Sequence, residues 1–295
     1  MEKKVSLVLS GGGARGIAHI GVIEELLARD FQISSVAGAS MGALVGGVFA
    51  LGKLEEFKKW LIGLDKRKIF SLVDFTLSSQ GLVKGDRIMN RMKDFIPDAK
   101  IEELDISYCA IATDLKNKKE IVFRKGSVYD AIRASIAIPT VFTPVETASG
   151  LLVDGGVVNN IPVNHVKRSE NDLLIAVNVN ADVPVDSHFN KTKKKDDEDE
   201  KSVYRQKITE FYEHIKSLIP HSKEDHFGYF DLINNTIAMM TNHIAGGILE
   251  KYPPEILIET SRDTCGTFDF YRAEELIQLG RRAAIKKLDE YEKTQ

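Results

Sequence analysis

Three short segments of the chain combine small residues with side chains that can do chemistry. The first is GGGARG, residues 11–16. The second is GASMG, residues 38–42, which contains Ser40, and the third is LLVDGG, residues 151–156, which contains Asp154. Backbone amides of glycines can bind a negative charge, a serine hydroxyl can act as a nucleophile, and a carboxylate can take up a proton. The three segments are therefore candidate parts of an acyl-transfer site, although the first also suits a nucleotide.

The glycine-rich segment has two interpretations. It matches the dinucleotide fingerprint G-x-G-x-x-G through Gly11, Gly13 and Gly16, and it lies between an expected strand and an expected helix. That fingerprint also needs an acidic residue about 20 positions further on, at the end of the second strand. Asp30 precedes that strand, whose end at 37–40 holds only small residues. A nucleotide-binding regulatory module stays an alternative, although the acidic residue that would bind the ribose is missing.

The GASMG segment fits the pattern G-x-S-x-G of a nucleophile elbow. In such an elbow the serine occupies a tight turn from a strand into a helix, and small neighbours let the backbone turn sharply. Gly38 and Gly42 supply these small neighbours around Ser40. The five-residue pattern is frequent by chance, and its place at an expected strand–helix junction favours a catalytic serine.

A serine nucleophile needs a group that takes its proton. No histidine has a context that marks it as this base, and packing or surface roles are expected for all seven: His19, His165, His188, His214, His221, His226 and His243. Asp154 is the better candidate, because it ends an apolar run that we expect to be a parallel strand, and Gly155 and Gly156 follow it. An Asp-Gly pair alone indicates only a turn, so the assignment depends on all three segments occurring together.

Taken in this order, GGGARG, GASMG and DGG resemble the patatin-like phospholipases, a family of lipid acyl hydrolases. The resemblance runs from residue 5 to about residue 180 and includes ASIAIPTVFTPV at 134–145. It implies a serine–aspartate dyad without a catalytic histidine, with the nucleophile at Ser40 and the aspartate at Asp154. It also implies an oxyanion hole formed by the glycine loop, at Gly11, Gly12 and Gly13, with Arg15 beside them.

The expected activity is therefore hydrolysis of acyl esters of lipids, of the phospholipase A or lysophospholipase type. A soluble carboxylesterase or thioesterase with the same dyad is the close alternative. No metal-ligand spacing and no cofactor motif is present in the sequence, so none is expected. The apolar residues Ile136, Ile138 and Phe142 around Pro139 suit either the wall of an acyl pocket or ordinary core packing.

Short apolar runs that alternate with helical patterns predict one α/β domain over 1–295, with three layers (α/β/α) and a mainly parallel central sheet. The expected strands are 5–9, 34–37, 106–113, 120–124, 151–153, 172–179 and 255–260. Helices are expected after the glycine loop, after Ser40, over 227–249 and over 271–291, and the part from 227 to 295 completes the domain.

One segment, residues 182–226, departs from this pattern. It begins with a polar stretch in which a basic block directly precedes an acidic one, so we expect a mobile surface insertion. An amphipathic helical pattern follows over 203–219. This pattern and the helix over 227–249 suit packing on the core or on a second subunit, or else a lid or lipid-contacting surface.

Composition limits the partners. The 295 residues hold 40 Lys and Arg against 43 Asp and Glu, a net charge of −3, which argues against nucleic acid as the main partner. Cys109 and Cys265 are far apart and fit reduced thiols in a reducing compartment. Since neither a secretion signal nor an apolar run of about 18 residues is found, we expect a cytoplasmic protein. Peripheral contact with the inner membrane surface and homo-oligomerisation both stay open.

Overall fold

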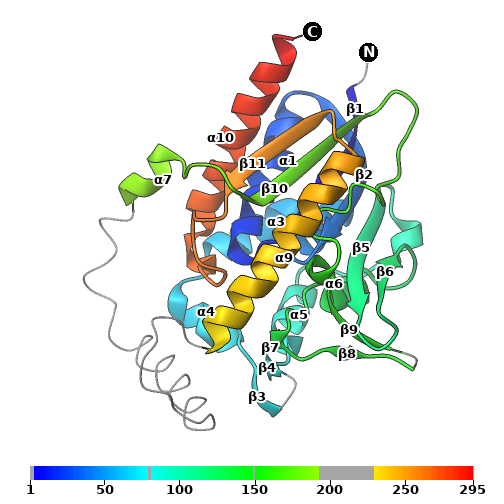
Figure 1. Ribbon diagram of the computed structural model, residues 1–295, viewed down its shortest axis with the longest axis vertical. Coiled ribbons are helices and arrows are strands. Elements are labelled where there is room, and N and C mark those ends of the chain that lie inside the picture. The colour runs from blue at the N-terminus through cyan, green and yellow to red at the C-terminus, as the bar shows by residue number, and fades with distance from the viewer. Residues whose placement is uncertain (1–2, 79–80, 149, 193–228, 295) are drawn as a thin grey trace.

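The computed structural model describes residues 3–78, 81–148, 150–192 and 229–294 (Figure 1). Its centre is a mixed sheet of eight strands in the order β11-β10-β1-β2-β5-β9-β8, with β6 also paired to β5. Five of these strands run parallel to one another: β11 (Ile256–Ser261), β10 (Leu173–Ala181), β1 (Lys3–Leu9), β2 (Phe31–Ala39) and β5 (Ser107–Asp114). The predicted α/β fold with a mainly parallel sheet is confirmed.

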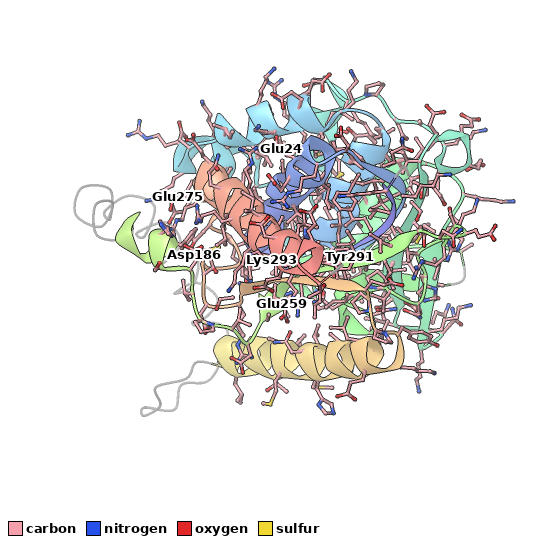
Figure 2. All side chains as sticks on the ribbon, turned by 90° about the horizontal axis from the view of Figure 1, so that it is seen from above. Glu24, Asp186, Glu259, Glu275, Tyr291 and Lys293 are labelled. Carbon is pink, nitrogen blue, oxygen red and sulfur yellow. The ribbon has the colours of Figure 1, made fainter. Side chains whose placement is uncertain are left out.

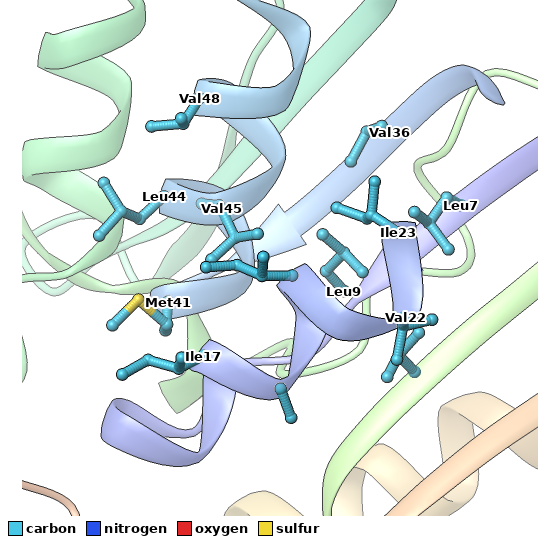
Figure 3. Packing of buried hydrophobic residues seen from close by; sticks show 14 of the residues in the cluster. Leu7, Leu9, Ile17, Val22, Ile23, Val36, Met41, Leu44, Val45 and Val48 are labelled. Carbon is cyan, nitrogen blue, oxygen red and sulfur yellow. The ribbon is translucent and has the colours of Figure 1, made fainter. Parts of the chain in front are cut away.

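The parallel strands are buried on both faces, which is why their sequences are almost continuously apolar. In β1, Leu7 and Leu9 belong to one hydrophobic cluster and Val8 to another on the opposite face. Helices that contribute to the first cluster include α1 (Ala18–Ala28), α2 (Met41–Ala50), α3 (Leu54–Ile62), α6 (Val128–Ser135) and α10 (Ala273–Glu292). Figure 3 shows side chains of α1 and α2 meeting those of the strands.

The second face is covered by α9 (Tyr229–Lys251), through Ala245, and by the chain around residues 161–166. Seen from above, α9 lies beyond the sheet, on the side away from α1 and α10 (Figure 2). The molecule therefore has the predicted three layers. Both α9 and α10 agree with the helices expected from the sequence.

At the other end of the sheet, three strands are antiparallel to their neighbours: β6 (Lys119–Phe123), β9 (Leu151–Asp154) and β8 (Val145–Glu146). The expectation that Asp154 ends a parallel strand is wrong, since β9 runs antiparallel to β5. An apolar run of four residues carries no information about its direction, which depends on the connection that precedes it.

Several elements have no counterpart in the sequence-based prediction. A small second sheet joins β3 (Phe75–Ser78), β4 (Gly81–Val83) and β7 (Thr140–Phe142). Two further short helices, α4 (Lys66–Leu72) and α5 (Asp86–Lys93), precede and follow its first hairpin. These strands and helices are short, with at most eight residues each, so their sequences show little periodicity.

The described start of the expected insertion, residues 182–192, contains the helix α7 (Ser187–Thr192). Phe189 of this helix is buried, and Asp186 before it pairs with Arg282 of α10 at 3.2 Å. The charged block and the amphipathic pattern over 203–219 lie outside the described residues. No described helix combines the length and the apolar character that crossing a membrane requires.

Candidate active site

Ser40 occupies the turn between β2 and α2 with φ +52° and ψ −124°. A positive φ is rare for a residue with a side chain, and such a strained backbone typically costs about 1–3 kcal/mol. The turn is possible because Gly42 has no side chain: a Cβ there would lie 2.1 Å from the carbonyl oxygen of Leu9. The backbone N–H of Ser40 donates to Oγ of Ser135 at 2.9 Å. Ser40 therefore has the conformation of a nucleophile elbow.

The strand register brings Ser40 and Asp154 together. Ala39, the last residue of β2, pairs with Ile111 of β5, and Asp154, the last residue of β9, pairs with Ala112. β6 pairs with residues 110–114 of β5, the stretch that also contacts β2 and β9. It therefore lies along one edge of β5, and both β2 and β9 lie along the other edge. β2 and β9 thus meet end to end along one edge of β5, and the serine and the aspartate lie at the junction.

Asp154 is a buried carboxyl group with one free oxygen. Its Oδ1 accepts a hydrogen bond from the backbone N–H of Gly156 at 2.7 Å, and its Oδ2 has no partner among the described residues. Burial raises the pKa of Asp154 to about 6, against the opposing effects of hydrogen bonding from the Ser40 side chain and from the Gly156 amide. The Ser40 hydroxyl is thus close enough to lower this pKa, while Oδ2 accepts no hydrogen bond from a described residue. A carboxylate with this pKa is ionised at neutral pH and is well placed to accept a proton.

The glycine loop lies directly beside Ser40. A Cβ on Gly11 would lie 3.0 Å from the Cβ of Ser40. The Gly11 amide already donates to the carbonyl oxygen of Asn160 at 3.1 Å, whereas the amides of Gly12 and Gly13 donate to no acceptor in the part of the chain that the structure describes. The loop also precedes the helical segment that begins at Gly13, whose amino end favours negative charge. Gly12 and Gly13 are therefore the candidate donors to an oxyanion.

The side chain of Arg15 is directed elsewhere. Its Nε and Nη2 donate to Oδ1 of Asn180 at 3.2 and 2.9 Å, and its Nη1 donates to the carbonyl oxygen of Cys265 at 3.0 Å. Burial lowers the pKa of Arg15, while Cys265, Asp263 and Asp269 oppose this effect. The guanidinium therefore ties the glycine loop to β10 and to the loop after β11.

Comparison with known proteins agrees with this arrangement. The model of the family described as Patatin-like phospholipase matches residues 7–167, which include the glycine loop, Ser40 and Asp154. The chain belongs to the patatin-like phospholipase family. Membership supports lipid hydrolysis as its general class of activity.

Its relatives differ greatly in length. An uncharacterized NTE family protein of Mycobacterium tuberculosis is 34% identical, over 98% of this chain and 92% of its own length. The Lysophospholipase NTE1 of Candida glabrata is 25% identical over 94% of this chain, which spans only 15% of that protein. The crystal structure of VipD from Legionella pneumophila shares the fold, with a TM-score of 0.50 at 16% identity, covering 98% of this chain and 67% of that chain.

In this patatin-like chain the described histidines make no hydrogen bond to Ser40 or Asp154. His19 is buried behind the glycine loop, where its Nε2 is 2.8 Å from the carbonyl oxygen of Ser10, and burial lowers its pKa to about 4. His165 contacts Glu120 at 2.8 Å, and His188 and His243 lie exposed on α7 and α9. The other three histidines lie outside the described residues.

Sequence reasoning missed residues that hold the site, Ser135 and Asn160 among them. Ser135 accepts a hydrogen bond from the Ser40 amide; it lies in the segment 134–145 that resembles the family, but the sequence assigned it no role. Asn160 accepts a hydrogen bond from the Gly11 amide. It follows the DGG motif closely in the sequence, and this closeness could have marked it as a residue near the site. Near Pro139, Ile136 packs against the main core, so the acyl-pocket interpretation stays a prediction.

The sequence analysis predicts that no metal or cofactor is bound, and this stays a prediction. Among the described residues, no group of three or more His, Cys, Asp or Glu is arranged to hold a metal ion.

Proposed function

We propose that this protein is a serine hydrolase that cleaves acyl esters of lipids, of the phospholipase A or lysophospholipase type. The observation that carries the proposal is the junction of β2 and β9, which sets the strained Ser40 beside a buried carboxyl group with a free oxygen. The raised pKa of Asp154 supports its role as the general base.

In the proposed first half-reaction, Oγ of Ser40 attacks the ester carbonyl while Asp154 accepts the hydroxyl proton. The carbonyl oxygen becomes an oxyanion, which the amides of Gly12 and Gly13 stabilise. Loss of one such donor typically slows a reaction by a factor of about 100 to 1000. The intermediate then collapses to an acyl-Ser40 ester, and the departing alcohol takes the proton from Asp154.

In the second half-reaction, Asp154 takes a proton from water as the water attacks the acyl-Ser40 carbonyl. A second oxyanion forms in the same place and collapses, and the fatty acid leaves as Ser40 regains its proton. The same carboxyl group therefore serves as base and acid in both halves, which suits a pKa near the working pH.

The two alternatives differ in their support. A soluble carboxylesterase or thioesterase would use the same residues, so only substrates separate it from a lipid hydrolase. The nucleotide-binding alternative has no specific support, because Asp30 precedes β2, whereas the glycine loop lies at the opposite, carboxyl end of that strand, where Leu9 pairs with Gly38.

The test is release of fatty acid from phospholipid and lysophospholipid vesicles, with soluble nitrophenyl esters and thioesters run in parallel. Ser40→Ala and Asp154→Asn are each expected to lower the rate by about a thousandfold or more. A fluorophosphonate probe is expected to label the wild type and not Ser40→Ala. Wild-type rates in either variant would refute the dyad.

Matched controls come from the start of α6. Ser127→Ala and Asp130→Asn make the same chemical changes away from the site and are expected to keep the activity. A wild type that hydrolyses soluble esters and ignores lipids would favour the carboxylesterase alternative. A calorimetric signal with NAD or ATP would favour the nucleotide module.

We also propose that the protein reaches its substrate by peripheral contact with a lipid surface. The supporting observation is α9, which contacts the turn after Asp154 and exposes Leu232, Met239 and Met240. Residues 232–249 of this helix contain no Asp, Glu, Lys or Arg. An exposed, uncharged apolar surface is typical of an interaction site.

A further inference from the structure

Asn180 lies near the end of β10, beside the glycine loop and beyond the residues that match the family. Its side-chain amide makes contacts on both sides. Nδ2 donates to the carbonyl oxygen of Gly11 at 2.6 Å, and Oδ1 accepts from Nε and Nη2 of Arg15 at 3.2 and 2.9 Å. Asn180 therefore connects a buried arginine to one particular peptide group of the loop.

That peptide group contains the Gly12 amide. The carbonyl of Gly11 and the N–H of Gly12 belong to one planar trans peptide, so they point in opposite directions. A hydrogen bond that fixes the Gly11 carbonyl toward Asn180 consequently fixes the Gly12 N–H away from it. The preceding Gly11 N–H is held separately, by the carbonyl of Asn160.

The loop needs such an external hold because its own residues are permissive. A Cβ on Gly12 would lie 2.4 Å from Cγ2 of Val179, so the position requires glycine. Glycine–glycine peptides rotate readily between alternative orientations, since neither residue has a side chain to restrict them. The packing requires glycine at this position but does not fix the orientation of the peptide. The direction of the Gly12 N–H therefore depends on the hydrogen bonds that the Gly11–Gly12 peptide makes.

Arg15 determines which way the Asn180 amide faces. Only the oxygen of an amide can accept the two guanidinium N–H groups, so Nδ2 is left to face the Gly11 carbonyl. The third nitrogen of the guanidinium is anchored on the carbonyl of Cys265 at 3.0 Å. The chain of contacts from Cys265 through Arg15 and Asn180 to Gly11 has one consistent donor–acceptor order.

We infer that Asn180 is a positioning residue for the oxyanion hole: it holds the Gly11–Gly12 peptide so that the Gly12 N–H faces the oxyanion formed on attack by Ser40. The inference rests on the proposed function, because an oxyanion forms only if Ser40 acts as the nucleophile. Asn180 itself touches neither substrate nor the reacting atoms.

Asn180→Asp is the sharpest test. A carboxylate keeps both bonds from Arg15 but has no N–H to donate, so it repels the Gly11 carbonyl and favours a rotated peptide. With a soluble nitrophenyl ester, kcat is expected to fall by about 10- to 100-fold, the larger value approaching the effect of losing one oxyanion donor. KM is expected to change by less than about twofold. Asn178→Asp is the matched control, since Oδ1 of Asn178 only accepts a hydrogen bond, from the backbone N–H of Asn180 at 3.0 Å.

Inhibitor binding separates positioning from a general structural role. A trifluoromethyl ketone forms a tetrahedral oxyanion on Ser40, so its inhibition constant is expected to rise by the same factor as kcat/KM falls. Binding of the fatty acid product, which needs no oxyanion hole, is expected to stay unchanged. Equal weakening of both ligands, or a wild-type kcat in Asn180→Asp, would overturn the inference.

A measurement on the wild type keeps the test independent of the folding of the variant. In glycine-labelled protein, the ketone adduct is expected to shift the amide proton of Gly12 downfield, and an unshifted Gly12 signal would overturn the inference. Asn180→Ala offers a second, uncharged variant with the same expected loss in kcat. A wild type that hydrolyses no ester and forms no adduct would instead refute the proposed function, so the two failures are distinguishable.

Discussion

The backbone N–H of Ser40 is held by Oγ of Ser135, the last residue of α6, at a distance of 2.9 Å. Both residues are buried, so water cannot replace this hydrogen bond. Because the Ser40 backbone is strained, the bond from α6 helps to maintain a conformation that the chain would otherwise leave. The contact joins the end of α6 to the turn that carries Ser40.

Removing this acceptor gives a first prediction. Ser135→Ala leaves a buried N–H without a partner, so the free energy of unfolding is expected to fall by about 1–3 kcal/mol. Relaxation of the elbow is expected to lower kcat as well, by about tenfold. Urea unfolding and ester hydrolysis measure the two effects.

Ser127→Ala is the control on the same helix. Ser127 accepts a bond from the Asp130 amide at the start of α6, so its loss is expected to cost about 1 kcal/mol of stability with no loss of activity. If both variants lose stability and neither loses activity, Ser135 has no role in holding the nucleophile.

The pKa of Asp154 gives a second prediction. Its proposed role requires the ionised form, and burial raises the pKa to about 6. The value of kcat/KM is therefore expected to rise with pH through about 6 and to be constant above it. His19, with a pKa lowered to about 4, does not titrate in this range. A profile that is flat between pH 5 and pH 8 contradicts the assignment.

The same shift predicts a pH-dependent cost in stability. A carboxyl group whose pKa is raised by folding binds its proton more tightly in the folded state, so its contribution to stability is lost as pH rises from about 4 through about 6. Asp154→Asn cannot ionise. Its free energy of unfolding, relative to wild type, is therefore expected to be higher at pH 8 than at pH 4. Chemical denaturation at the two pH values measures this, and an equal difference at both would contradict it.

The alternation of apolar runs with helical patterns was enough to predict the fold class, and the family resemblance carried by the three segments implied that Ser40 and Asp154 lie near one another. Local chemistry made this possible, since a strand–serine–helix turn and a glycine run each have a strong sequence pattern. The direction of β9 was missed because it depends on a long-range pairing with β5 that four apolar residues cannot encode.

The supporting residues were also missed, for a related reason. Ser135 and Asn180 act through single hydrogen bonds to backbone atoms far away in the chain, and a serine or asparagine in the sequence does not reveal such a partner. The Gly11 amide likewise donates to the carbonyl oxygen of Asn160, which leaves Gly12 and Gly13 as the candidate oxyanion donors. Only the three-dimensional contacts show this.

Gly42 gives a prediction whose sign is opposite to the usual one. Alanine in place of glycine inside a helix normally adds about 1 kcal/mol of stability. At Gly42 the added Cβ would lie 2.1 Å from the Leu9 carbonyl, which cannot move away, so Gly42→Ala is expected to yield little folded, active protein. Gly246→Ala in α9 is the control and is expected to fold normally, since an added Cβ there would lie within 4 Å of no described atom outside its own stretch of helix. Soluble yield and melting temperature check both variants.

The exposed face of α9 carries the last prediction. Met239 and Met240 are 69% and 60% exposed, on a helix that contacts the turn following Asp154. Burying a methionine side chain in an apolar phase is worth about 1.5–3 kcal/mol when complete. If this face enters a lipid surface, the double change of Met239 and Met240 to Gln is expected to weaken binding to phospholipid vesicles by about tenfold or more. Hydrolysis of a soluble nitrophenyl ester is expected to stay at the wild-type rate, because neither residue forms part of the dyad. Sedimentation with vesicles and light scattering distinguish the outcomes: unchanged vesicle binding together with a change from dimer to monomer would assign the face to a second copy of the chain.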